Sequence, residues 1–273
     1  MNHLIFDTHA HYNDDAFAED RDEVLSGLRA HGIGTVVNIC SDLESIGETL
    51  ELMEKYPWIY GAAGIHPTDT APLNEENFKT VIEALKHPKM LAVGEIGLDY
   101  YWDEPEQEIQ KRWFERQLEL AREVKKPVSI HSRDAAQDTL DLMKAHHSEE
   151  IGGVIHCFSY GTEMAREYLN MGFYLGIGGV LTYKNGKKLK EVADYAPLDR
   201  IVLETDCPYL SPTPFRGKRN SSANLTYVAE ELAAIKGMTV EDVIAQTTKN
   251  ARMLYRMDAE QAGCSGDSRM QLE

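Results

Sequence analysis

Histidine and carboxylate residues follow several short apolar runs of this chain. His9 and His11 come after the run Leu4–Phe6 and are separated by one residue. In an extended segment, residues i and i+2 point to the same side, so two imidazoles at this spacing can bind one metal ion. Later runs lead into four further candidate ligands: Glu95, His131, His156 and Asp206. Such a mixture of imidazole and carboxylate donors suits Zn²⁺, Mn²⁺ or Mg²⁺.

These six residues exceed the three protein ligands and one water of a tetrahedral catalytic zinc, so they predict two metal ions. The simplest division places three ligands on the first ion: His9, His11 and Asp206. The second ion takes the two later histidines, and Glu95 bridges both ions. Metal ions about 3.5–4 Å apart can activate a water molecule and stabilise the attacking and leaving oxygens. Glu204 either orients a ligand or pairs with a cation inside the fold.

The ligands can meet only if the preceding strands bring their ends together. Short apolar runs predict eight strands: Leu4–Phe6, Thr35–Ile39, Ile59–Gly64, Leu91–Ile96, Val128–Ile130, Val154–Ile155, Phe173–Gly176 and Ile201–Leu203. The runs are continuous rather than alternating, which is typical of parallel strands buried on both faces. In TIM barrels, chemistry is placed at the carboxyl ends of the strands.

Helical patterns separate these runs. One apolar face covers residues 109–124, and two final helices are expected over Ala223–Lys236 and Val240–Tyr255, the last with Thr239 as its N-cap. Alternation of strands and helices predicts an α/β fold, namely a (β/α)8 TIM barrel of the metal-dependent hydrolase type. The alternative is an open doubly wound sheet, although the first run is not followed by the glycine pattern of dinucleotide-binding sheets.

One domain is expected over residues 1–257, with a disordered tail over residues 258–273, where the sequence is small, polar and unpatterned. The chain carries 28 Lys and Arg against 45 Asp and Glu, a formal net charge of −17. It therefore repels bulk polyanions, and nucleic-acid binding requires a local cationic patch. Neither a membrane-spanning run nor a signal-peptide pattern is present, and no two cysteines form a Cys-x-x-Cys pair. We expect reduced thiols, a cytoplasmic location, no membrane partner and no obligate protein partner.

Seven motifs fall in order along the chain: Asp-Thr-His-Ala-His, Gly-Ile-His-Pro, Gly-Glu-Ile-Gly-Leu-Asp-Tyr, Pro-Val-Ser-Ile-His-Ser-Arg, Ile-His-Cys-Phe-Ser, Glu-Thr-Asp-Cys-Pro-Tyr-Leu and Arg-Gly-Lys-Arg-Asn. In this combination the chain resembles the TatD-related metal-dependent hydrolases, also called TatD deoxyribonucleases, from Phe6 to about Tyr255. It departs from their usual Glu-Pro at Ser221-Ser222.

The resemblance implies a barrel of the amidohydrolase type with divalent metal ions. It implies hydrolysis of DNA phosphodiester bonds by a metal-activated water, with RNA as a further possible substrate. The expected activity is that of a 3′–5′ exonuclease on single strands. Asp206 would be both a metal ligand and the proton acceptor, and Glu95 would be the second catalytic residue.

Five residues are expected to contact the substrate: His66, Arg133, Arg216, Lys218 and Arg219. His66 is either a phosphate contact or a structural residue before Pro67. A guanidinium matches phosphate oxygens, which favours Arg133. The last three follow the eighth run, and loops after strands seven and eight of a TIM barrel frequently bind phosphate. Trp102 and its tyrosine neighbours either stack on bases or pack within their loop.

Two other functions compete with a nuclease. An amidohydrolase-type enzyme acting on a small ester, lactone or amide would have the same fold. Many such enzymes bridge their metals with a carboxylated lysine, whereas the fourth run carries Glu95 and the nearest lysine, Lys89, precedes it. A non-catalytic binding protein on this scaffold would have lost a ligand, and all six are present.

Overall fold

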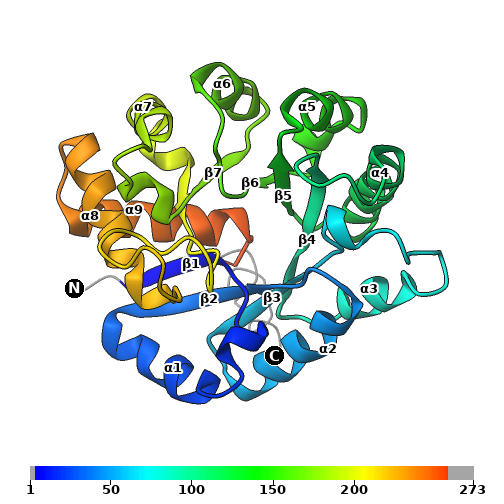
Figure 1. Ribbon diagram of the computed structural model, residues 1–273, viewed down its shortest axis with the longest axis horizontal. Coiled ribbons are helices and arrows are strands. Elements are labelled where there is room, and N and C mark those ends of the chain that lie inside the picture. The colour runs from blue at the N-terminus through cyan, green and yellow to red at the C-terminus, as the bar shows by residue number, and fades with distance from the viewer. Residues whose placement is uncertain (1–3, 258–273) are drawn as a thin grey trace, which may run out of the picture.

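A computed structural model describes residues 4–257 of the chain (Figure 1). Its centre is an eight-stranded parallel sheet in which each strand pairs with the next along the chain. The strands are β1 (Ile5–Ala10), β2 (Ile33–Ile39), β3 (Ile59–Ala63), β4 (Met90–Asp99), β5 (Val128–Arg133), β6 (Gly153–Ile155), β7 (Tyr174–Ile177) and β8 (Ile201–Leu203). This order confirms the barrel and excludes the doubly wound alternative. The tail expected over residues 258–273 lies outside the described residues.

Helices surround the strands (Figure 1). They are α1 (Arg21–Gly27), α2 (Leu43–Lys55), α3 (Lys79–Ala84), α4 (Gln107–Val124), α5 (Ala136–Ala145), α6 (Thr162–Asn170), α7 (Lys187–Tyr195), α8 (Leu225–Lys236) and α9 (Val240–Leu254). The face expected over residues 109–124 packs against the barrel, where Trp113 and Leu120 of α4 are buried. Thr239 caps α9 as predicted, since its side chain accepts a hydrogen bond from the Asp242 backbone N–H. No helix within residues 4–257 is both long and apolar enough to cross a membrane.

Three strands continue three or more residues beyond the apolar runs that predicted them. β1 continues to Ala10, β4 to Asp99 and β5 to Arg133, where Asp99 pairs with Arg133. Gly97 lets β4 and β5 approach, because a Cβ atom there would lie 1.9 Å from the carbonyl oxygen of His131. The extension places two predicted ligands, His9 and His131, inside hydrogen-bonded strands rather than in the loops after them, so the backbone fixes their positions.

The barrel closes between β1 and the segment just after β8. The Asp206 N–H donates to the His9 carbonyl at 2.9 Å, and the His11 N–H donates to the Cys207 carbonyl at 2.8 Å. Below them, the Thr8 hydroxyl donates to the Leu203 carbonyl at 3.1 Å. We call this contact between β1 and residues 203–207 the seam.

Helix α9 covers the end of the barrel at which the strands begin. Tyr255, just after α9, stacks on Phe6 with ring centroids 5.9 Å apart, and its hydroxyl donates to the Thr8 carbonyl. The Asn250 amide donates to the carbonyl of Ile201 at the start of β8. These contacts fill this end with packed side chains, so the opposite end, where the strands finish, carries the polar groups.

Candidate active site

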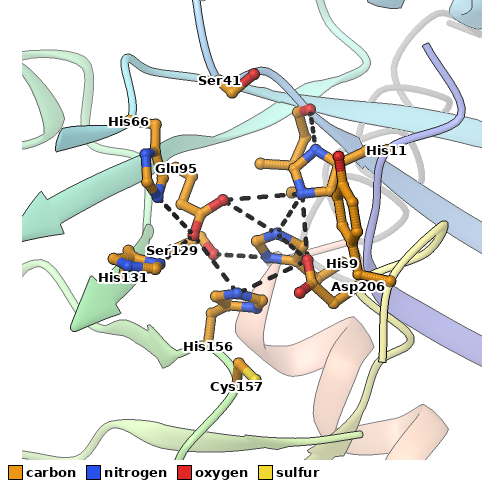
Figure 2. A network of polar contacts seen from close by, with 12 residues as sticks. His9, His11, Ser41, His66, Glu95, Ser129, His131, His156, Cys157 and Asp206 are labelled. Carbon is orange, nitrogen blue, oxygen red and sulfur yellow. Dashed lines mark hydrogen bonds and ion pairs between the residues drawn. The ribbon is translucent and has the colours of Figure 1, made fainter. Parts of the chain in front are cut away.

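The polar groups at the carboxyl ends of the strands are arranged around Glu95, whose side chain is 4 % exposed (Figure 2). Glu95 Oε2 lies 3.3 Å from His9 Nε2 and 3.8 Å from His11 Nε2. Those two ring nitrogens are 3.1 Å apart. Asp206 Oδ1 lies 3.3 Å from His11 Nε2 and 3.7 Å from His9 Nε2. We call His9, His11 and Asp206 the first half of the site.

The other oxygen of Glu95 faces a second set of imidazoles. Glu95 Oε1 lies 2.8 Å from His131 Nδ1 and 3.4 Å from His156 Nε2. His66 Nε2 is farther away, at 3.8 Å. We call His131 and His156 the second half of the site. Glu95 therefore presents one oxygen to each half, which is the arrangement that a carboxylate bridging two cations requires.

The donor atoms fit divalent metal ions. Within the described chain, four groups have ligand atoms within 4.8 Å of one another: His9, His11 and Asp206; His9, Glu95 and His156; His66, Asp99 and His131; His156, Cys157 and Glu204. The first group is the set predicted for one ion. In the second group, His9 takes the place predicted for His131. Imidazole nitrogens and carboxylate oxygens packed this closely are typical of a metal site.

Each ligand imidazole has a partner on its other ring nitrogen, and in the first half these partners are neutral. His11 Nδ1 lies 3.0 Å from the Ile39 carbonyl oxygen, and His9 Nδ1 lies 3.4 Å from the Ser129 hydroxyl. Such contacts fix the tautomer and the orientation of a metal-binding ring.

In the second half, the partners are carboxylates. His131 Nε2 lies 3.0 Å from Asp99 Oδ2, and His156 Nδ1 lies 3.1 Å from Glu204 Oε1. Gly176 makes room for Glu204, since a Cβ atom there would lie 2.2 Å from Glu204 Oε2. Glu204 thus lies where it could orient His156, which is one of the two roles that the sequence allowed. Asp99 was not predicted, although it belongs to the Gly-Glu-Ile-Gly-Leu-Asp-Tyr motif.

Against the effect of burial, Asp206 raises the pKa of His11 in the first half, and carboxylates raise the pKa of both histidines in the second half, so His9 is the one ring of the two halves whose pKa is lowered. Burial and the neighbouring His156 lower the pKa of His9. Burial also acts to lower the pKa of His156, but Glu204, Glu95 and Asp206 outweigh it and raise that pKa to about 10. For Glu95 and Asp206, burial acts to raise the pKa, while the surrounding imidazoles lower it below its usual value. Both carboxylates are therefore ionised at neutral pH.

Asp7 of β1 lies beneath the first half of the site and connects β1 to residues on the other side of the seam. Its fully buried carboxyl group accepts hydrogen bonds from the hydroxyls of Thr205 and Ser222, both at 2.6 Å. Burial raises the pKa of Asp7 to about 7, and these hydrogen bonds oppose a larger rise. Ser222, at the departure from the family pattern, thereby supports the backbone of β1.

A cavity of about 720 Å³ opens above the cluster. Of the predicted substrate contacts, His66 and Arg133 line it. The Thr68 N–H donates to His66 Nδ1, which leaves His66 Nε2 facing the cluster. Burial lowers the pKa of His66 to about 3, so this ring is neutral.

The other three predicted contacts lie elsewhere. Arg219 forms an ion pair with Asp20 at 2.6 Å. The Arg216 guanidinium lies 4.0 Å from the centre of the Tyr183 ring. Neither residue, nor Lys218, is among the side chains that line the cavity in the described chain. The structure therefore brings the six predicted metal ligands together, but not the predicted cationic loop.

Known proteins resemble this chain over nearly its whole length. The family model described as TatD related DNase matches residues 6–256. The uncharacterized metal-dependent hydrolase YabD of Bacillus subtilis is 44 % identical over 255 residues, covering 93 % of this chain and all of that protein. The 3′-5′ ssDNA/RNA exonuclease TatD of Salmonella typhimurium is 30 % identical, covering 93 % of this chain and 99 % of that protein. The crystal structure of YJJV, a TatD homolog from Escherichia coli K12, superposes with a TM-score of 0.88 at 29 % identity, covering 94 % of this chain and 99 % of the other.

Proposed function

Because this chain belongs to the TatD-related DNase family and is a metal-dependent hydrolase, we propose that it removes nucleotides from the 3′ end of single-stranded DNA. The Salmonella relative, whose name states a 3′-5′ activity on single-stranded DNA and RNA, supports this substrate, with RNA as a second one. The observation that carries the proposal is the position of Glu95, with one oxygen facing each half of a ligand cluster beneath an open cavity.

Two divalent ions would be held at this cluster. The first half with Glu95 Oε2 would bind one, and the second half with Glu95 Oε1 would bind the other. When bound, the ions would supply positive charge that polarises a phosphoryl oxygen and makes a nearby water more acidic.

Asp206 is the group suited to take the proton from the attacking water. Its side chain is 18 % exposed, against 4 % for Glu95, so it is the ligand carboxylate with more access to the cavity. Its lowered pKa keeps it ionised and able to accept a proton. The water oxygen forms a bond to phosphorus as the bond from phosphorus to the leaving 3′ oxygen breaks. The leaving oxygen takes a proton from solvent in the cavity.

The neutral His66 and the cationic Arg133 contact the phosphate groups. Both line the cavity, and a guanidinium matches the geometry of phosphate oxygens. The acidic protein as a whole repels DNA, so these contacts and the bound ions supply the local attraction that the net charge of −17 does not.

The test is hydrolysis by the purified protein loaded in turn with Mg²⁺, Mn²⁺ or Zn²⁺. Substrates are single-stranded DNA labelled at the 5′ end, the same sequence as RNA and as duplex DNA, and a panel of p-nitrophenyl carboxylic esters. We expect stepwise shortening of the single strands from the 3′ end, released 5′-mononucleotides, and no reaction in EDTA. Hydrolysis of the esters without any shortening of the oligonucleotides would favour the amidohydrolase alternative instead.

A further inference from the structure

Two exposed aromatic side chains, Trp102 and Tyr209, are among those that line the cavity. The described chain has four large aromatic residues with high exposure: Tyr101 at 54 %, Trp102 at 55 %, Tyr195 at 49 % and Tyr209 at 55 %. Tyr101 and Trp102 follow β4, and Tyr209 follows β8. Exposed aromatic rings are costly to leave in water, and those beside a binding cavity commonly serve as stacking surfaces.

One group of these residues forms a cationic wall beside the second half of the site. The Tyr101 and Trp102 rings meet edge to face, with centroids 4.9 Å apart, and the Arg133 guanidinium lies 3.7 Å from the centre of the Tyr101 ring. Arg133 is two residues after the ligand His131 and is the single Lys or Arg among the described residues that line the cavity. We call Tyr101, Trp102 and Arg133 the tryptophan wall.

The opposite group is acidic and lies beside the first half. The Tyr209 hydroxyl donates to Asp14 Oδ2 at 2.7 Å, and both residues line the cavity. The Tyr209 N–H donates to the carbonyl of the ligand Asp206 at 2.9 Å, which fixes this wall next to the proposed proton acceptor. We call Tyr209 and Asp14 the tyrosine wall.

Resting on the proposed function, we propose that the two walls bind the nucleosides on either side of the scissile phosphate. The 3′-terminal nucleoside stacks on Tyr209, with its free 3′-hydroxyl near Asp14. The preceding nucleoside stacks on Trp102, and the phosphates of the remaining strand pass Arg133. Both stacking contacts are tolerant of sequence, because every base has an aromatic face.

The charges of the two walls and the geometry of the reaction both place the 3′ end of the bound DNA strand at the tyrosine wall. The terminal nucleoside ends in a 3′-hydroxyl, which can donate a hydrogen bond to the Asp14 carboxylate. A 3′-phosphate at the same place would be repelled by the charge of Asp14. In an in-line displacement, the attacking water and the leaving 3′ oxygen lie on opposite sides of phosphorus. Since Asp206 takes the proton of the water on the tyrosine-wall side, the leaving oxygen and the strand attached to it lie toward the tryptophan wall.

The experiment compares four 5′-labelled DNA oligonucleotides. One is unmodified, one lacks the 3′-terminal base, one lacks the base before it, and one carries a 3′-phosphate. kcat/KM is measured for each, and binding of phosphorothioate-linked versions, which resist hydrolysis, is measured by fluorescence anisotropy. Each missing base is expected to weaken the reaction and binding roughly five- to one-hundred-fold in the unmodified protein.

Three variants assign the walls. In Trp102→Ala, loss of the penultimate base should no longer weaken reaction and binding, whereas loss of the terminal base should weaken them as in the unmodified protein. In Trp102→Phe, loss of the penultimate base should still weaken them nearly as much as in the unmodified protein. Tyr209→Ala has the reverse effect. Asp14→Asn, which can still cap the turn after it, narrows the preference for a 3′-hydroxyl over a 3′-phosphate. Tyr195→Ala, an exposed aromatic residue at the end of α7, is the control and behaves as the unmodified protein.

The outcomes separate the two proposals. If the Trp102 and Tyr209 variants weaken all four oligonucleotides by equal factors, or if the two penalties are exchanged between the walls, the stacking assignment is overturned while the nuclease function stands. If the unmodified protein binds the oligonucleotides without cleaving them, the proposed function fails and the binding data still decide the stacking assignment. A protein that neither binds nor cleaves them overturns both.

Discussion

The two halves of the site hold the same kind of side chain in different electrostatic surroundings. In the first half, the far ring nitrogens of the histidines meet a hydroxyl and a backbone carbonyl. In the second half they meet the carboxylates of Asp99 and Glu204. A carboxylate partner makes an imidazole a stronger metal ligand and also a stronger base. The cluster is therefore electrostatically asymmetric: a metal ion bound by His156 would have to displace a proton, whereas one bound by His9 would meet a neutral ring.

Removing Glu95 breaks both halves at once and has the largest expected effect. In Glu95→Ala, the loss of both bridging oxygens should release at least one metal ion and lower turnover by several orders of magnitude. The barrel should still fold, because backbone pairing holds β4 between β3 and β5. Mass spectrometry measures the metal content, and circular dichroism measures whether the barrel is folded. Glu76→Gln, on the surface beside Lys79, is the matched control, and a variant that kept both metals and a near-native rate would end the bridging role.

Asp206 tests the function of the first half alone. Asp206→Asn keeps the size of the side chain but cannot accept the proton of the attacking water. General base catalysis contributes about 10²–10⁴-fold, so kcat should fall by that range while KM changes less. Steady-state kinetics on a single-stranded oligonucleotide measures both. An unchanged kcat would exclude Asp206 as the proton acceptor.

The pH dependence of metal binding sharpens the contrast between the halves. His156, with its pKa raised to about 10, carries a proton at neutral pH in the metal-free protein, whereas the lowered pKa of His9 leaves that ring neutral. A metal ion that binds His156 must displace the proton, so its affinity should rise about tenfold per pH unit up to that pKa. Calorimetry in buffers of different ionisation enthalpy counts the protons released. Glu204→Gln lowers the pKa of His156 and should reduce that count; an unchanged count would contradict the role of Glu204.

Replacing the partners of the imidazoles compares the halves directly. Glu204→Gln should weaken metal binding to the second half about 10–100-fold, the usual effect of losing a carboxylate behind a metal-binding histidine. Ser129→Ala, which removes the 3.4 Å contact to His9, should cost less because that partner is neutral and more distant. Competition with a chelator of known affinity gives both values. Equal losses in the two variants would show that partner charge does not distinguish the halves.

The cationic loop after β8 should have the smallest effect. Replacing Arg216, Lys218 and Arg219 by Ala should flatten the salt dependence of oligonucleotide binding, since each phosphate contact contributes about −0.7 to the slope of log K. The change should stay below the ~2 units that three contacts would give, because Arg219 is already paired with Asp20. A salt titration of binding measures the slope. No change would place the polyanion entirely within the cavity.

The fold and the candidate ligands could be predicted because both depend on short stretches of sequence, namely the apolar runs and the residues that follow them. Continuous apolar runs mark parallel strands, and a ligand at the end of each run must face the same opening once the sheet closes. The positions at which the strands end were predicted less accurately. β4 was expected to stop at Ile96 and continues to Asp99, because pairing with β5 and the absence of a side chain at Gly97 hold polar residues in the ladder.

The partners behind the ligands could not be predicted in the same way. The sequence analysis made no prediction for Asp99 and left two roles open for Glu204, because each role depends on which ring nitrogen a histidine turns toward the carboxylate. That orientation comes from packing between neighbouring strands, for which one sequence holds no signal. The cationic loop was predicted from its charge and its place after the eighth run, and neither specifies that Arg219 turns outward to Asp20.

The seam has a consequence for the synthesis of the protein. The first half of the site takes His9 and His11 from β1 and Asp206 from the segment after β8, so its ligands are nearly two hundred residues apart in the chain. Contacts of such long sequence separation form late, because a long loop must close before they exist. A chain emerging from the ribosome therefore has no complete ligand set until its last strand has been made. The first half of the site is therefore completed only when residues 203–207 contact β1.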